Sequence, residues 1–233
     1  MNEDKELPSS WVSLKEAVIL MALIAIIITI TAPLINVAIK PWPAIWRFFI
    51  LTVWQSLVVI GMVGLVFFSR RLSLKDLGLG LPMFSQGLGP GIYWGTGIFI
   101  AVIISGMVMQ QFLPIPPKPQ AFAEVLLAAQ RPVELGAGIL IAVVVAPLAE
   151  ELLFRGLLFP AMRERVGPTA AIILNGVLFA GVHMDLFRFI PLAVGGMFLA
   201  WLFNRSRNLY VAIAAHGTWN ALMLAVLLLG KFA

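Results

Sequence analysis

The side chains able to do acid–base chemistry inside apolar sequence are confined to the second half of this 233-residue chain. An ionisable side chain at the centre of a bilayer costs about 2.5–3.5 kcal/mol, so its presence there usually marks a function. The long apolar stretches of the first half contain none. Those of the second half contain Glu150, Glu151, Arg155, His183 and His216, and the chain has no other histidine. This uneven distribution predicts a single chemical site.

Two adjacent carboxylates in this part of the chain are expected to have different tasks. Glu151 and Arg155 are four residues apart, so on a helix they lie on one face, about 5–6 Å apart at Cβ, and can form an ion pair. Glu150 points about 100° away and has no charged partner on its own helix. A carboxylate without a partner can take a proton from water, as a general base does. The alternative is an ion-pair network that only fixes helix packing.

Each histidine has a polar or aromatic neighbour one helical turn away. Phe179 precedes His183 by four residues, so its ring can pack on the imidazole and orient it. His216 precedes Asn220 by four residues, and an imidazole with a carboxamide can donate two hydrogen bonds to a developing oxyanion. Glu150 and the two histidines could equally hold a divalent metal ion that acidifies a bound water. The spacing leaves both kinds of site open.

Small residues near these side chains predict close contacts between helices. Gly176, Gly181, Gly195 and Gly196 all interrupt apolar stretches of the second half. In a membrane, such residues let two helices approach closely. Trp219 is expected to pack or to anchor its helix rather than to react.

The composition predicts that membrane-spanning helices position this site. Hydrophobic residues make up 61% of the chain and charged residues 12%, about half the charged fraction of a soluble domain. A helix needs about 20 apolar residues to cross a bilayer, and the period-two pattern of a membrane β-barrel is absent. We expect an all-α, polytopic membrane bundle of about seven helices, within a range of six to eight. The predicted spans are Ala17–Ile39, Phe48–Phe68, Gly91–Leu113, Leu135–Met162, Pro168–His183, Phe189–Phe203 and Leu209–Leu229.

Three connecting segments separate the first spans from the site. Ser69–Pro90 is predicted to be a linker that is basic at its start. Pro114–Pro119 is a stiff turn that cannot continue a helix. Ala121–Arg131 has apolar residues at helical spacing, which is typical of a helix in the membrane interface or of a buried connector. The chain is therefore divided into N-terminal membrane helices and linkers, residues 1–120, and a core that carries the site, residues 121–233.

The net charge of +5 bears on the class of binding partner, and the absence of cysteine excludes several kinds of chemical site. The basic residues are scattered singly between apolar runs, which favours anionic lipid headgroups and not nucleic acid as the partner. Without cysteine there is no disulfide, thiolate metal site or cysteine nucleophile. The acidic start MNEDKE argues against a cleaved signal peptide.

The distribution of basic residues also predicts an orientation. If the spans alternate, nine basic residues share the side of the N-terminus and six lie opposite, which favours a cytoplasmic N-terminus. The nine are Lys5, Lys15, Arg70, Arg71, Lys75, Arg163, Arg165, Arg205 and Arg207.

Three motifs on successive apolar helices resemble the CAAX-protease and bacteriocin-processing family, also called CPBP or Abi. They are EExxxR at Glu150–Arg155, FxxxH at Phe179–His183 and HxxxN at His216–Asn220. The ordered trio is specific, although each motif alone is weak. The resemblance covers about residues 121–229, and the stretch SLKDLGL is similar to a linker found ahead of that core.

The resemblance implies an intramembrane endopeptidase similar to the CAAX prenyl endopeptidase. Family members enclose a catalytic cavity with their last four helices. On that pattern Glu150 and His183 would activate a water, while His216 and Asn220 would bind the oxyanion. The architecture would be held by Glu151 and Arg155, with Phe179 in support. The resemblance also implies a membrane-associated protein or peptide substrate, with or without a prenyl group. Zinc or another divalent metal bound by Glu150, His183 and His216 fits the family, and so does a metal-free mechanism.

Other intramembrane proteases lack support in this sequence. It has no HExxH pair, no GxSG serine, and no aspartate well inside a span: the three aspartates are Asp4, Asp76 and Asp185. Two other classes of function remain open. Buried carboxylates and histidines also build the relays of proton-coupled transporters. A non-catalytic membrane scaffold or immunity protein is the third hypothesis.

Overall fold

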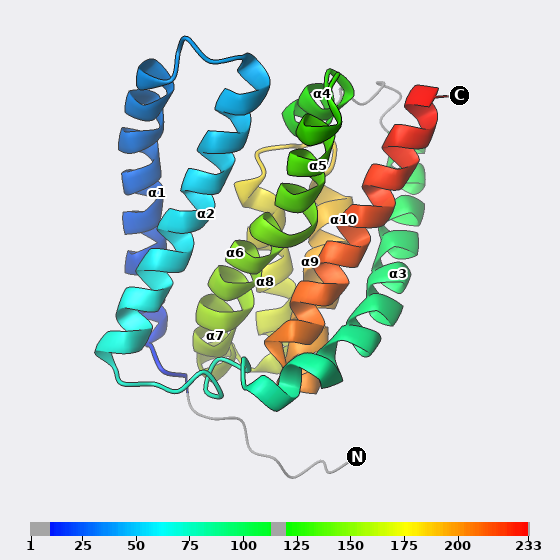
Figure 1. Cartoon of the computed structure of the whole chain (residues 1–233). Helices are drawn as coiled ribbons and strands as arrows, with labels where there is room; N and C mark the ends of the chain where they lie inside the picture. The colour runs from blue at the N-terminus through cyan, green and yellow to red at the C-terminus, as the bar shows by residue number, and fades with distance from the viewer. Residues whose placement is uncertain (1–9, 113–119, 233) are drawn as a thin grey trace.

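The computed structural model describes residues 10–112 and 120–232, and within them it contains helices and no strands (Figure 1). The first helices are α1 (Leu14–Ala38), α2 (Ala44–Ser69), α3 (Leu81–Phe112) and the short α4 (Ala121–Leu127). One continuous helical run follows, made of α5 (Pro132–Leu140), the π-helical η1 (Ile141–Val145), α6 (Ala146–Glu151), the π-helical η2 (Leu152–Leu158) and α7 (Phe159–Val166). The chain closes with α8 (Pro168–Val182), α9 (Phe189–Ser206) and α10 (Leu209–Phe232).

The predicted membrane bundle is confirmed. Among the described residues, six helical segments are long and apolar enough to cross a membrane, and α8 is a shorter apolar helix of 15 residues. Many of their large apolar side chains are exposed, as contact with lipid requires. The chain is a multi-pass membrane protein. The start of α1 and the end of α10 lie at opposite ends of the bundle (Figure 1).

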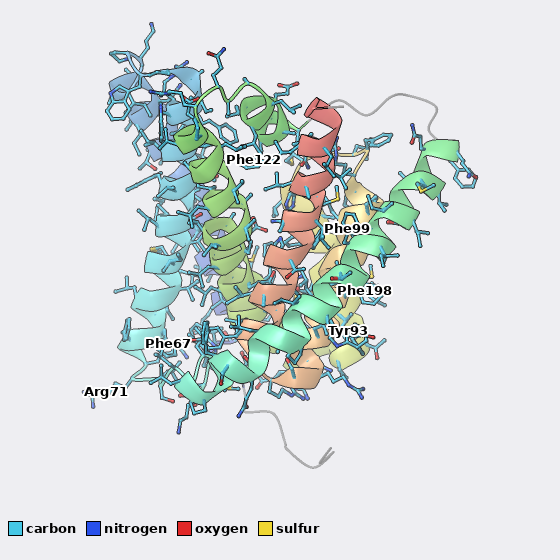
Figure 2. The ribbon with its side chains drawn as sticks, turned by 45° about the vertical axis from the view of Figure 1, so that its right-hand side comes forward. Phe67, Arg71, Tyr93, Phe99, Phe122 and Phe198 are labelled. Carbon is cyan, nitrogen blue, oxygen red and sulfur yellow. The ribbon has the colours of Figure 1, made fainter. Side chains whose placement is uncertain are left out.

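Helix α3 differs from the sequence prediction. It begins at Leu81, ten residues before the predicted span, so the second half of the predicted linker 69–90 is helical and Pro90 lies inside the helix. A stripe of glycines explains where this early part packs. These glycines leave no room for a side chain. A Cβ atom on Gly87 would lie 2.8 Å from the Cβ of Tyr210, one on Gly91 would lie 2.4 Å from the Cβ of Ala214, and one on Gly95 would lie 2.5 Å from the Ala215 oxygen. The backbone of α3 therefore lies directly against α10, and its outer face, with the exposed Tyr93, points away (Figure 2).

Replacing Gly91 by leucine is expected to destabilise the bundle, because the side chain would have to displace α10. Inserting apolar atoms into a packed contact costs about 1–3 kcal/mol. The thermal unfolding midpoint of the purified protein in detergent would show the loss. Gly97→Leu is the matched control, since Gly97 lies on the exposed side of the same helix with only Trp94 within 4 Å. Equal midpoints for both variants would contradict close packing of α3 on α10.

The connector before the site packs on the bundle through one side. Helix α4 lies at the end of the bundle opposite the start of α1, where Phe122 contacts Phe48 of α2 at 6.0 Å between ring centroids (Figures 1 and 2). Leu126 is fully buried and touches the position of Gly138 in α5, whereas Glu124 and Arg131 are exposed. Both interpretations of Ala121–Arg131 therefore remain open. The predicted turn Pro114–Pro119 lies outside the described residues.

Candidate active site

The helix that carries the two adjacent glutamates changes its winding on both sides of them. Helix α6 contains Glu150 and Glu151 and lies between the π-helical segments η1 and η2. A π turn shifts the backbone hydrogen-bond pattern, and such turns are frequent at functional sites. Side chains of α10, of α8 and of the segment before α1 bond to carbonyls in these segments: Asn220 Nδ2 to Ala142, Asn175 Nδ2 to Phe154 and Trp11 Nε1 to Gly156, at 2.8, 3.0 and 3.0 Å. Three contacts from distant parts of the chain thus hold the two π-helical segments around the glutamates.

The predicted ion pair between Glu151 and Arg155 is present. Arg155 Nη1 donates to Glu151 Oε1 at 2.8 Å, and both side chains are fully buried. Arg155 Nη2 donates to the Gly196 oxygen at 2.7 Å, and the guanidinium lies 4.9 Å from the centre of the Phe179 ring. Two buried charges are tolerated only where such partners offset their desolvation.

Glu151 has a second partner that the spacing could not reveal. Its Oε1 lies 2.8 Å from Nδ1 of His216, which is 65 residues further along the chain. A carboxylate beside an arginine accepts hydrogen bonds, so Nδ1 of His216 carries the proton and donates it. The ring is also stacked on Trp219 at 5.4 Å. Its tautomer and its orientation are therefore both fixed, with Nε2 facing Glu150.

Glu150 lies beside His216 and is partly exposed. Its side chain is 33% exposed, and its Oε2 lies 3.8 Å from Nε2 of His216. This oxygen is buried, yet it has no hydrogen-bond partner in the described part of the chain. A buried carboxylate oxygen without a partner is costly, so its persistence calls for a function.

His183 lies at the end of α8 and is exposed. Its Nδ1 is 2.7 Å from the Phe179 oxygen. A carbonyl oxygen only accepts, so Nδ1 donates and Nε2 keeps its lone pair when the ring is neutral. The predicted packing of Phe179 is confirmed, because its ring lies 4.8 Å from His183 and 5.6 Å from His216. Phe179 therefore joins the two imidazoles, although among the described residues His183 makes no direct bond to Glu150.

The loop after His183 is braced by a local ion pair. Asp185 accepts hydrogen bonds from the backbone and side chain of Arg188 at 3.0 and 2.5 Å. Burial raises the pKa of Asp185, but these hydrogen bonds outweigh it and hold the pKa below its usual value. The aspartate therefore stays ionised and keeps the turn beside His183 closed at neutral pH.

Asn220 lies one turn after His216 on α10, as its spacing predicted. Its Nδ2 donates one hydrogen bond to the Ala142 oxygen. A carboxamide nitrogen carries two N–H groups, so the second can serve a substrate.

The glycine predictions are confirmed at three positions and wrong at one. A Cβ on Gly176 would lie 2.5 Å from Met197, one on Gly195 would lie 2.7 Å from Trp219, and one on Gly196 would lie 2.9 Å from the Cα of Gly176. Gly181 was expected to allow a close contact, but nothing lies within 4 Å of its Cβ position because that face of α8 is exposed.

The donor set does not form a metal site in this arrangement. Within residues 10–112 and 120–232, no three histidine, aspartate or glutamate side chains come together as a metal ion requires. The Nδ1 atoms of both histidines bond to oxygen partners, which leaves Nε2 of each ring for a metal or a substrate. The prediction that Glu150, His183 and His216 hold zinc stays a prediction.

Known proteins match the part of the chain that carries this site. Residues 132–222 match the family described as "Type II CAAX prenyl endopeptidase Rce1-like". A Bacillus subtilis (strain 168) protein named "Putative membrane peptidase YdiL" is 28% identical over 142 residues, which are 58% of this chain and 56% of that protein. The match thus spans about half the length of this curated relative. No solved structure matches the chain. The resemblance drawn from the three motifs is confirmed.

Proposed function

From the match of residues 132–222 to the CAAX prenyl endopeptidase family, we propose that the chain is an intramembrane endopeptidase. It hydrolyses a peptide bond in a membrane-associated substrate by means of a water activated by glutamate and histidine. The observation that carries the proposal is Glu150 Oε2, a buried oxygen without a partner that faces Nε2 of His216 at 3.8 Å. A water within hydrogen-bonding distance of both atoms would be held between the carboxylate and the imidazole.

The proposed reaction assigns one task to each side chain. Glu150, assisted by Nε2 of His183, takes a proton from the water as its oxygen attacks the peptide carbonyl carbon. The C–O bond forms, and the carbonyl oxygen becomes an oxyanion that accepts hydrogen bonds from His216 and Asn220. The proton taken from the water then passes to the leaving nitrogen as the C–N bond breaks.

Donation to the oxyanion requires a proton on Nε2 of His216. Because Nδ1 already donates to Glu151, the ring must then carry both protons and a positive charge. The Glu151 carboxylate stabilises that charge, and Arg155 keeps the carboxylate in place. Glu151 is therefore a positioning residue for His216, in addition to its place in the ion pair.

The substrate is proposed only as a class. A site between membrane helices suits a protein or peptide that is itself held in the bilayer, with or without a prenyl group. We further propose that the N-terminus is cytoplasmic and that residues 121–233 form the catalytic membrane core, with residues 1–120 supporting it.

Cleavage of a quenched-fluorescence peptide panel by the purified protein in nanodiscs tests the proposal. The panel contains prenylated and unprenylated peptides, with and without a chelator. His183→Ala is expected to lower the rate about 10²-fold, because general-base assistance contributes factors of this size. Met184→Ala is the control. Met184 is 91% exposed in the same loop, so this variant should cleave the peptides at the wild-type rate. Unchanged cleavage by His183→Ala would remove His183 from the mechanism, and loss of cleavage with the chelator, restored by zinc, would favour a metal-bound water.

A further inference from the structure

A cavity at the N-terminal end of the bundle has no place in the proposed reaction. Its volume is about 190 Å³, which is more than a single water needs. Its walls come from the segment before α1, the α2–α3 loop, the start of α3, α7 and the end of α9. Arg163 of this cavity lies just before α8 and His183 at its other end, so about 22 Å of helix separates the cavity from His183.

Two arginines of the cavity wall have buried nitrogens without partners. Nε of Arg163 and Nη1 of Arg207 are inaccessible to solvent and bond to nothing in the described part of the chain. Both side chains are only partly buried and line the cavity, so each guanidinium group has donor capacity that the described part of the chain does not use. The two guanidinium groups also repel each other: burial, and then the charge of Arg163, lower the pKa of Arg207 to about 10.

The carboxylates of the cavity do not supply the missing acceptors. Asp76 accepts hydrogen bonds from the backbone and hydroxyl of Ser73 at 2.7 and 2.8 Å. Glu164 accepts from the backbone of Ser10. With Lys75 and the two arginines, the five charged wall residues carry a net charge of +1. The cavity therefore lacks an anion and not a cation.

The backbone holds this cationic wall in place. The N–H of Leu209 donates to the Gly78 oxygen at 3.0 Å, which ties the α2–α3 loop to the start of α10. Gly78 has a φ of 71°, and an added Cβ would lie 2.9 Å from the Arg207 oxygen. The loop that carries Lys75 is thus fixed against Arg207, beside a space whose remaining wall is largely apolar, with Phe159, Phe203 and Met83.

We propose that this cavity binds a phosphate group, carried by an anionic phospholipid headgroup or by a soluble phosphate. Phosphate oxygens match the paired donors of guanidinium groups. The apolar wall accommodates the carbons next to the phosphate. The cavity also lies at the end of the bundle that collects the basic residues, including the exposed Arg71 (Figure 2), where anionic lipids of the cytoplasmic leaflet are within reach.

Native mass spectrometry of the full chain in detergent tests the site directly, without an assay of cleavage. The probes are didecanoyl-phosphatidylglycerol, didecanoyl-phosphatidylcholine and inorganic phosphate. Arg163→Gln with Arg207→Gln is expected to weaken phosphatidylglycerol binding about 30-fold, from about fivefold for each basic residue near an anionic headgroup. The matched control is Arg71→Gln with Arg165→Gln, which removes the same charge from exposed positions at the same end of the bundle. Arg71, like Arg207, has a left-handed backbone conformation, so both double variants change one such residue.

The outcomes separate the sources of the phosphate. Preference of the wild type and the control for phosphatidylglycerol over phosphatidylcholine, lost in the cavity variant, establishes a lipid site. A soluble source is established if the wild type does not distinguish the two lipids but binds inorganic phosphate, and if this binding depends on the same two arginines. Equal binding by both double variants, or a wild type that neither prefers phosphatidylglycerol nor binds phosphate, overturns the proposal. If the cavity variant does not fold, Arg207→Gln alone, with an expected fivefold loss, carries the test.

Discussion

Glu150→Gln is expected to lower the rate of peptide cleavage by about 10²–10⁴-fold, the contribution of a positioned general base. Glutamine keeps the volume and the hydrogen-bonding oxygen of the side chain but cannot take up a proton at neutral pH. Because Oε2 of Glu150 accepts no hydrogen bond from a described residue, the replacement breaks no hydrogen bond at this atom, so the thermal midpoint should change little from the wild type. The loss should therefore appear in kcat and not in the amount of folded protein.

A second glutamate shows whether that loss is specific. Glu124→Gln removes an exposed carboxylate from α4 and should leave cleavage unchanged. Cleavage by Glu150→Gln at the wild-type rate would falsify the proposed role of Glu150 and would favour a non-catalytic function for the chain. Wild-type protein that folds but cleaves no peptide of the panel would leave the substrate unknown.

Arg155→Met is expected to have the largest effect on stability. It leaves the fully buried Glu151 carboxylate without its arginine, with His216 as its remaining partner, and removes the donor to the Gly196 oxygen. Breaking a buried ion pair in this way costs about 3–5 kcal/mol. The free energy of unfolding, measured by denaturant titration in mixed micelles, should fall by that amount.

Two further variants identify the cause of this loss. Arg131→Met removes the 59% exposed arginine of the Arg131–Glu134 pair and should cost far less, because Glu134 keeps its hydrogen bonds from the backbone N–H groups of Gln130 and Arg131. The double variant Glu151→Gln with Arg155→Met removes both buried charges and should recover much of the stability. It should still cleave slowly, because His216 loses its anionic partner. A double variant no more stable than Arg155→Met would show that packing, and not the unpaired charge, governs the loss.

The sequence was sufficient for whatever depends on neighbours along one helix. Hydropathy located the spans, and a spacing of four residues predicted the pairs Glu151–Arg155 and Phe179–His183, because both partners share a helix face. The helical stretch Leu81–Pro90 was missed because it is rich in glycine and proline, which usually end helices. Gly87, Gly91 and Gly95 of the same helix nevertheless follow one another at intervals of four, which is a readable sign of close helix packing.

Contacts between helices could not be predicted in the same way. The bond between Glu151 and His216 joins two spans, and one sequence does not state which faces of two helices meet. Asn175 was missed for the same reason, since an asparagine in an apolar helix gives no sign that it bonds to the Phe154 oxygen on another. The π-helical segments also have no local sequence signature, because they depend on partners elsewhere in the bundle.

Those π-helical segments have a consequence for how this region tolerates changes in length. A π turn holds about one residue more than an α turn, and each residue added to a helix rotates whatever follows by about 100°. Loss of a single residue within Ile141–Val145 would let the segment rewind as an ordinary helix, and α5 would turn relative to Glu150 and Glu151. The distance in sequence between α5 and the glutamates is therefore as tightly constrained as the identity of the glutamates. When homologous sequences are aligned, a gap inside this apolar stretch therefore indicates a change in the geometry of the site. It should not be treated as a neutral change of length in a membrane-spanning helix.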